Sequence, residues 1–150
     1  MRQQSSTNIF VDNYEAIRIT LRIMKRKLPR PTEGELELLQ ALWDKGPSTV
    51  RELHEAIGRH RPVGYTSVLK LLQIMTEKGL VEREESSRAH VYRAAATQDE
   101  TQTQLLRDIS RRLFAGSATQ LAMHALTMEP VSERELEELR NLIEQKRKRP

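Results

Sequence analysis

Four copies of one helix-start signature constrain the fold of this chain more than any other feature of its sequence. They are Thr32-x-x-Glu35, Thr49-x-x-Glu52, Thr97-x-x-Glu100 and Ser132-x-x-Glu135. In this capping box, the hydroxyl and the carboxylate each bond a backbone N–H that the first turn of a helix leaves unpaired. Each copy precedes a run of apolar residues at helical spacing, so we expect four helices to begin at these positions.

Three helices are predicted in the first half of the chain, at 33–45, 50–57 and 65–78. Apolar residues recur there every three or four positions, and a glycine closes each run. Trp43 lies on an apolar face, and we interpret it as a core residue. The predicted buried faces carry Leu36, Leu39, Leu42 and Trp43, then Val50, Leu53 and Ile57, then Val68, Leu71, Leu72 and Met75.

After residue 79 the apolar period changes from helical to alternating. Residues 80–84 and 89–93 are predicted strands, joined by 85–88 into a hairpin. Three short helices followed by a hairpin is the order of a winged helix-turn-helix. The predicted fold class is therefore mostly α with a small β-hairpin. A winged helix-turn-helix domain at 29–96 is followed by a helical dimerisation region at 97–146 and a basic tail at 147–150.

The dimerisation region is predicted to contain helices near 98–114, 117–128 and 132–146. Three short helices share too little mutual core to stand alone, so we expect their apolar faces to meet a second copy. The candidate interface residues are Leu105, Ile109, Leu113, Leu121, Leu136, Leu139 and Ile143.

Residues 1–28 differ from the rest of the chain. We interpret them as a flexible leader that contributes no core. The alternative is a short helix that opens at Asp12 and carries an apolar stripe of Ile17, Leu21, Met24 and Leu28. Met24 is itself an alternative start of the natural protein, because the organised sequence follows it directly.

The third predicted helix carries the candidate base contacts. Its outer face is small and polar, with Thr66, Lys70 and Gln73 in line and Ser67 at the edge. Hydroxyls bond base edges or phosphates, lysine reaches guanine acceptors, and glutamine pairs with adenine. Tyr65 opens the helix and either bonds a phosphate or packs across the helix start. A merely solvated helix face is the alternative interpretation, which the winged-helix context disfavours.

The predicted wing and one loop supply further basic candidates. Arg88 lies at the hairpin tip and His90 on the second strand, where a wing meets the DNA backbone or minor groove. Arg61 belongs to a basic loop before the third helix and is a candidate phosphate contact. Protection of an edge strand, or solubility alone, is the alternative role for these charges.

Composition narrows the function classes. The net charge is +4, which favours a polyanionic partner, whereas aromatic residues make up only 4% of the chain and argue against RNA binding. The chain contains no cysteine, and its four histidines match no metal-ligand motif. We therefore expect no enzyme activity, no cofactor and no metal. Since no apolar run suits a signal peptide or a membrane span, we expect a cytoplasmic protein.

Several segments together resemble the BlaI/MecI/CopY family of bacterial repressors. They are Pro31-Thr-Glu-Gly-Glu-Leu-Glu-Leu-Leu-Gln-Ala-Leu-Trp43, Gly46-Pro-Ser-Thr-Val-Arg-Glu-Leu53, Tyr65-Thr-Ser-Val-Leu-Lys-Leu-Leu72, Lys78-Gly-Leu-Val81 and His90-Val-Tyr-Arg93. The resemblance covers nearly everything from Leu28 onward. It implies a winged-helix domain, a helical dimerisation domain and repression at a palindromic DNA operator.

By position, the resemblance places Thr66, Ser67 and Lys70 where the recognition helix of the family contacts DNA bases. It also implies relief of repression by a signal, with a membrane sensor protease as a candidate partner. Two departures limit the carry-over. Lys70 replaces the threonine of the β-lactam repressors, and His124-Ala125 stands where those repressors carry their Asn-Phe cleavage site. The rival function is a winged-helix adaptor that binds protein instead of DNA.

Overall fold

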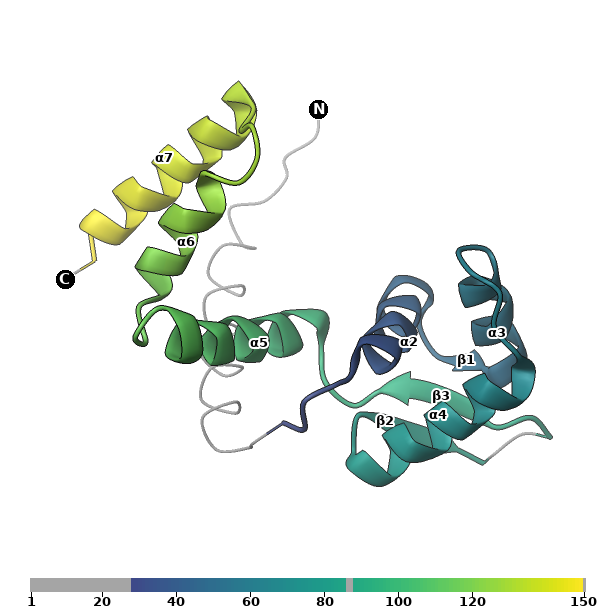
Figure 1. The fold of residues 1–150 in the computed structure, drawn as a ribbon. Coiled ribbons are helices and arrows are strands. Elements are labelled where there is room, and N and C mark those ends of the chain that lie inside the picture. Colours follow the sequence, from purple (N-terminus) through teal and green to yellow (C-terminus); the bar gives the residue numbers. More distant parts are fainter. Residues whose placement is uncertain (1–27, 86–87, 150) are drawn as a thin grey trace, which may run out of the picture. The chain divides into compact units, whose positions relative to one another are not determined.

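The computed structural model describes residues 28–85 and 88–149. The predictions for the leader, including the helix from Asp12 and a start at Met24, lie outside the described residues. The chain forms two compact units that divide within one helix, between Leu105 and Leu106. The sequence placed the boundary between domains earlier, at 96–97. Figure 1 labels the helices and strands of both units.

The first unit contains three helices and a small sheet. Helices α2 (Glu33–Lys45), α3 (Val50–Gly58) and α4 (Tyr65–Lys78) match the three predicted helices to within one residue. Strands β2 (Val81–Glu84) and β3 (Val91–Ala94) form the predicted hairpin, in antiparallel register with Arg83 opposite Tyr92. This order of elements is that of a winged helix, as the sequence predicted.

A third strand, β1 (Ser48–Thr49), was not predicted. It pairs with β3, so the sheet has the order β1-β3-β2. A strand of two residues is too short to show an alternating period, and Thr49 also serves as the N-cap of α3. The pairing places the start of α3 beside the loop end of the paired strands, because Thr49 lies opposite Val91, which also pairs with Glu84.

All four predicted capping boxes form. The backbone N–H of the cap residue donates to its glutamate at 2.8 Å for Thr32, 2.7 Å for Thr49, 2.7 Å for Thr97 and 2.8 Å for Ser132. In each case the glutamate N–H donates back to the hydroxyl. The sequence therefore locates these helix starts because the capping chemistry is local.

The core of the first unit is built from all three helices and the sheet. Leu38, Leu53, Leu72 and Met75 are fully buried, and Tyr92 of β3 is 1% exposed. The sequence missed Leu38 and Tyr92 and placed the half-buried Leu36 on the inner face instead. Three leucines fall within residues 36–39, so more than one helix face is apolar there, and the pattern alone does not select the buried face. The other predicted core residues pack in this cluster.

Trp43 packs against this core, as predicted, and also holds the chain that follows the sheet. It is half-buried, and its indole Nε1 donates to the carbonyl oxygen of Ala96 at 3.0 Å. On the same unit, the amide of Gln104 donates to the carbonyl oxygen of Leu28 at 2.5 Å. The first bond ties the turn before helix α5 (Gln98–Leu113) to α2, and the second ties Leu28 to α5.

One nearly buried ion pair joins the start of α2 to the end of α4. Glu35 is 2% exposed, and the ammonium of Lys78 lies 2.6 Å from its carboxylate. Burial alone raises the pKa of Glu35, but the hydrogen bonds from Lys78 and Thr32 outweigh it, and the net pKa is lowered. The charged pair therefore stabilises the angle at which α4 crosses α2.

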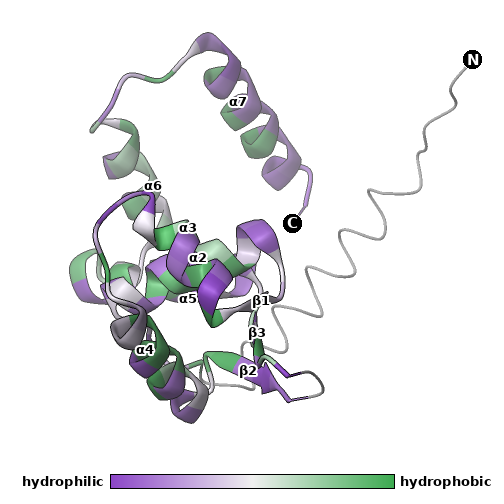
Figure 2. Cartoon of the chain, turned by 90° about the vertical axis from the view of Figure 1, so that its right-hand side faces the viewer, coloured by the Kyte–Doolittle hydropathy of each residue, from purple (hydrophilic) through white to green (hydrophobic). Residues whose placement is uncertain are grey.

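The second unit contains the end of α5, then α6 (Ala118–Leu126) and α7 (Glu133–Arg147). Its large apolar side chains remain largely exposed, including Leu113 at 74%, Met128 at 70% and Ile143 at 54%. Figure 2 shows the apolar bands of α7 in green beside polar bands in purple. None of the helices in residues 28–85 and 88–149 is long and apolar enough to cross a membrane.

Candidate DNA-binding surface

Helix α4 divides sharply into a buried face and an exposed face. Val68, Leu72 and Met75 are at most 2% exposed and fix the helix in the core. The candidate base contacts Thr66, Ser67, Lys70 and Gln73 are all exposed, together with Tyr65 at 48%. The core thus holds a small polar face outward on a rigid helix, which is the arrangement that base contacts in a major groove need.

The start of α4 differs from the other helix starts of the first unit. Gly64 is its N-cap and makes no side-chain capping bond, and the first turn contains no acidic residue. The first turns of α2 and α3, in contrast, carry acidic residues and capping boxes. The positive end of the α4 dipole is therefore not neutralised by a carboxylate of its own first turn.

His54 of α3 lies against this start. Its Nε2 lies 2.8 Å from the carbonyl oxygen of Val63, the residue before Gly64. Its ring meets the ring of Tyr65 edge-on, with centroids 5.8 Å apart and an interplanar angle of 77°. This role could not be predicted from the residue pattern, because a backbone acceptor leaves no trace in it.

The wing carries paired charges along its strands. Arg93 of β3 lies 3.1 Å from Glu82 of β2, and Arg83 forms an ion pair with Glu85. The hydrogen bond from Arg83 to Glu85 raises the pKa of the Arg83 guanidinium. The predicted contacts Arg88 and His90 have exposed side chains nearer the hairpin tip. The two strand arginines are therefore engaged within the wing itself.

Arg61 is held by helix α2. Its Nη2 lies 2.7 Å from the carboxylate of Glu37, and its Nε donates to both oxygens of that carboxylate. The hydrogen bond and the charge of Glu37 raise the pKa of Arg61. A phosphate contact by Arg61 would exchange this exposed pair for a bond to the DNA, and the role of Arg61 stays a prediction.

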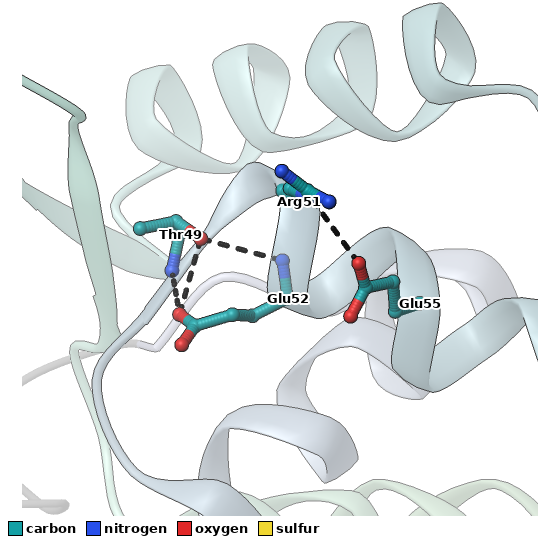
Figure 3. A network of polar contacts seen from close by, with 4 residues as sticks. All are labelled: Thr49, Arg51, Glu52 and Glu55. Atoms are coloured by element: carbon teal, nitrogen blue, oxygen red, sulfur yellow. Dashed lines mark hydrogen bonds and ion pairs between the residues drawn. The ribbon is translucent and has the colours of Figure 1, made fainter.

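Arg51 is a basic residue that the sequence analysis did not single out. It lies in the first turn of α3, with a side chain 84% exposed and 3.2 Å from Glu55 (Figure 3). A cation near a helix N-terminus opposes the helix dipole. That conflict is the sequence signal that could have marked Arg51 for a role other than helix stability.

The predicted dimerisation residues fall into two groups in the single chain. Ile109, Leu113, Leu136 and Ile143 are at least 40% exposed, whereas Leu105, Leu121 and Leu139 are half-buried. Leu105 lines a small pocket of the first unit together with Leu28 and Leu39. Their role in an interface between copies stays a prediction. Among the described residues, no cluster of three potential metal ligands occurs.

The comparisons with known proteins match this architecture. Residues 31–145 match the model of the penicillinase repressor family. The chain belongs to that family. It is 33% identical over 98 residues to the transcriptional regulator BlaI of Mycobacterium tuberculosis, which covers 65% of this chain and 71% of the relative. It is 20% identical over 123 residues to the methicillin resistance regulatory protein MecI of Mammaliicoccus sciuri, covering 82% and 100%.

Two solved structures share weaker similarity. The monomeric form of Bacillus licheniformis BlaI, in complex with the blaP half-operator, is 18% identical, with a TM-score of 0.44 over 49% of this chain and 90% of that chain. A MarR family protein from Bacillus stearothermophilus is 16% identical, with a TM-score of 0.46 over 97% of each chain. The family match confirms the resemblance found in the sequence, and this penicillinase repressor family member is a winged-helix DNA-binding repressor.

Proposed function

We propose that the chain binds an inverted-repeat DNA operator as a homodimer and represses transcription by occupying a promoter. The exposed polar face of α4 carries this proposal, because Thr66, Ser67 and Lys70 project from a helix that the core holds rigidly. Two copies related by a two-fold axis would place two such helices in successive major grooves. The operator would then mirror the symmetry of the protein.

Individual contacts follow from the chemistry of each side chain. Lys70 reaches guanine acceptors, Thr66 and Ser67 bond base edges or phosphates, and Gln73 pairs with adenine. Arg88 and His90 extend the contact to the backbone or minor groove. Arg51 adds a phosphate contact, since its exposed pair with Glu55 contributes little and is easily exchanged.

The second unit supports the homodimer. Residues 106–149 leave large apolar side chains exposed on all three helices, and a second copy offers the same surface. Self-complementary apolar surfaces are what a two-fold interface requires. The family resemblance also suggests relief of repression by a membrane sensor protease. His124 and Ala125, which stand where the β-lactam repressors carry their cleavage site, lie in the last turn of α6.

The test is binding by fluorescence anisotropy to DNA selected from a random pool, against scrambled DNA, across a salt series. We expect the selected DNA to bind at least about 10³-fold more tightly, with an affinity that falls steeply with salt. Equally weak binding to both DNAs would contradict the proposal and favour a protein-binding adaptor.

Lys70→Ala separates base contact from phosphate contact. We expect it to weaken binding to the selected DNA by about 1–3 kcal/mol and to relax the base preference at one position. The matched control is Lys45→Ala, which removes an exposed lysine at the end of α2. An equal loss on selected and scrambled DNA would instead make Lys70 a phosphate contact.

A further inference from the structure

The start of α4 has no side-chain cap. His54 contacts the chain on both sides of Gly64. Its Nε2 lies 2.8 Å from the carbonyl oxygen of Val63, and its ring packs edge-on against Tyr65 at 5.8 Å. A carbonyl oxygen only accepts, so Nε2 carries the proton and donates to Val63. The bond and the ring contact come from one half-buried side chain that α3 holds in place. Together they tie the residues before and after the flexible glycine to α3.

This tie sets the position of the base-contacting residues. Thr66 and Ser67 follow Tyr65 directly, so a shift or rotation of the first turn of α4 moves both hydroxyls. Contacts that distinguish bases tolerate displacements of only about 0.5 Å, whereas the attraction of phosphates for a basic surface is long-ranged and insensitive to such shifts. Loss of the tie should therefore reduce the selectivity of DNA binding more than its strength.

We propose that His54 is a positioning residue that fixes the start of α4 so that Thr66 and Ser67 meet their bases in one register. The proposal rests on the proposed DNA-binding function and names a residue outside the binding face. His54 acts through Val63 and Tyr65 and touches no DNA.

Three substitutions at one position separate the two contacts. His54→Gln keeps a donor for Val63 and loses the ring contact, His54→Phe keeps the ring contact and loses the donor, and His54→Ala loses both. The matched control is His60→Gln, which changes an exposed histidine in the connection between α3 and α4. Each full-length variant is first checked for a cooperative thermal transition, and the Gln and Phe variants preserve the comparison if the Ala variant fails to fold.

The first measurement is anisotropy with selected and scrambled DNA. We expect His54→Ala to lower the ratio of the two affinities by about tenfold, while its affinity for scrambled DNA and its salt slope stay those of the unsubstituted protein. His54→Gln and His54→Phe should lie between, and His60→Gln should keep the full ratio. An unchanged ratio in His54→Ala, or an equal loss on both DNAs, would overturn the proposal.

The second measurement needs no DNA and separates this proposal from the proposed function. Amide hydrogen exchange, followed by NMR, should be faster in His54→Ala at Val68, whose N–H donates to the carbonyl oxygen of Gly64 at 3.2 Å, with the end of α4 unchanged. If the unsubstituted protein shows no DNA preference, the proposed function fails, and this exchange result alone decides whether His54 positions the helix. Unchanged exchange at the Val68 amide would overturn the positioning role.

Discussion

The two compact units bury their apolar side chains to very different extents. In the first unit Leu38, Leu53 and Leu72 are fully buried. In the second unit Leu113 and Met128 are 74% and 70% exposed. Helices α6 and α7 of the second unit contain no buried residue, although Ser117 and Ser132 cap their starts through side-chain hydrogen bonds. Local helix signals are therefore equal in the two units, and only the packing differs.

This difference shows which apolar surface each unit needs for its stability. Most helical stability in proteins comes from packing of an apolar face, because capping contributes only about 1 kcal/mol per helix. The first unit supplies that packing within one chain. The second unit leaves it to another surface, which we propose is a second copy.

The largest effect is expected in the core of the first unit. Leu72→Ala should lower the free energy of unfolding by about 2–5 kcal/mol, because it leaves a cavity among fully packed side chains. The matched control, Leu113→Ala, changes the same residue type where it is 74% exposed and should shift the stability of the first unit by less than about 0.5 kcal/mol. Denaturant unfolding followed by the fluorescence of Trp43, the single tryptophan, measures both. Equal losses would contradict the contrast.

The next largest effect concerns association through the second unit. Ile143→Glu places a charge on the apolar stripe of α7 and should raise the dimer dissociation constant by about 100-fold, since a buried charge without a partner is costly. Gln145→Glu adds the same charge to an exposed polar position of α7 and should leave the constant within about twofold. Sedimentation velocity across a concentration series gives the constants. An unchanged constant for Ile143→Glu would remove α7 from the interface.

A smaller effect is expected at the ion pair between α2 and α4. Glu35→Gln should cost about 1–3 kcal/mol at neutral pH, because the charge of Lys78 loses its partner. The folded pKa of Glu35 lies below its ordinary value of 4.5, so the carboxylate stabilises the fold above about that pH. This contribution is lost as the pH falls through the folded pKa.

Urea unfolding between neutral and acid pH tests the assignment of that effect. The difference in stability between the unsubstituted protein and Glu35→Gln should shrink as the pH falls below about 4.5. Glu37→Gln, which removes the exposed partner of Arg61, should cost less than about 1 kcal/mol. A pH-independent difference for Glu35→Gln would mean that shape, not charge, sets the cost.

The smallest effect is expected in the turn between α5 and α6. Ala115 adopts a left-handed backbone with φ of 49°, which strains any side chain. Ala115→Gly should stabilise the second unit by about 0.5 kcal/mol after its entropic cost is subtracted. Ala118→Gly, in the first turn of α6, should destabilise it by about 0.5–1 kcal/mol. Thermal unfolding by circular dichroism distinguishes them by the opposite sign of the shift.

Sequence reasoning recovered the helices because their ends are marked locally. Thr32, Thr49 and Ser132 each mark the start of a helix, and Gly46 and Gly79 mark the ends of α2 and α4. The exposed polar face of α4 also followed from its period. Strand β1 did not, because two residues carry no period and its partner β3 lies far along the chain.

The candidate site was less accessible to prediction wherever a contact joins distant elements. Arg61 was predicted as a candidate phosphate contact, and its ion pair with Glu37 of α2, at 2.7 Å, could not be predicted from the sequence. His54 matched no motif, because its partners are a backbone carbonyl and an aromatic ring. Residue type and spacing report which groups are available, whereas tertiary packing decides which of them meet.

The proposed homodimer on an inverted repeat is tested most directly by symmetry in the DNA. Anisotropy titrations should compare a selected inverted repeat with the same DNA in which one half-site is scrambled and the other kept. We expect scrambling one half to weaken binding by about 30-fold or more, with two protomers on the intact site by analytical ultracentrifugation. Equal affinity for both DNAs, with one protomer bound to each, would contradict the account.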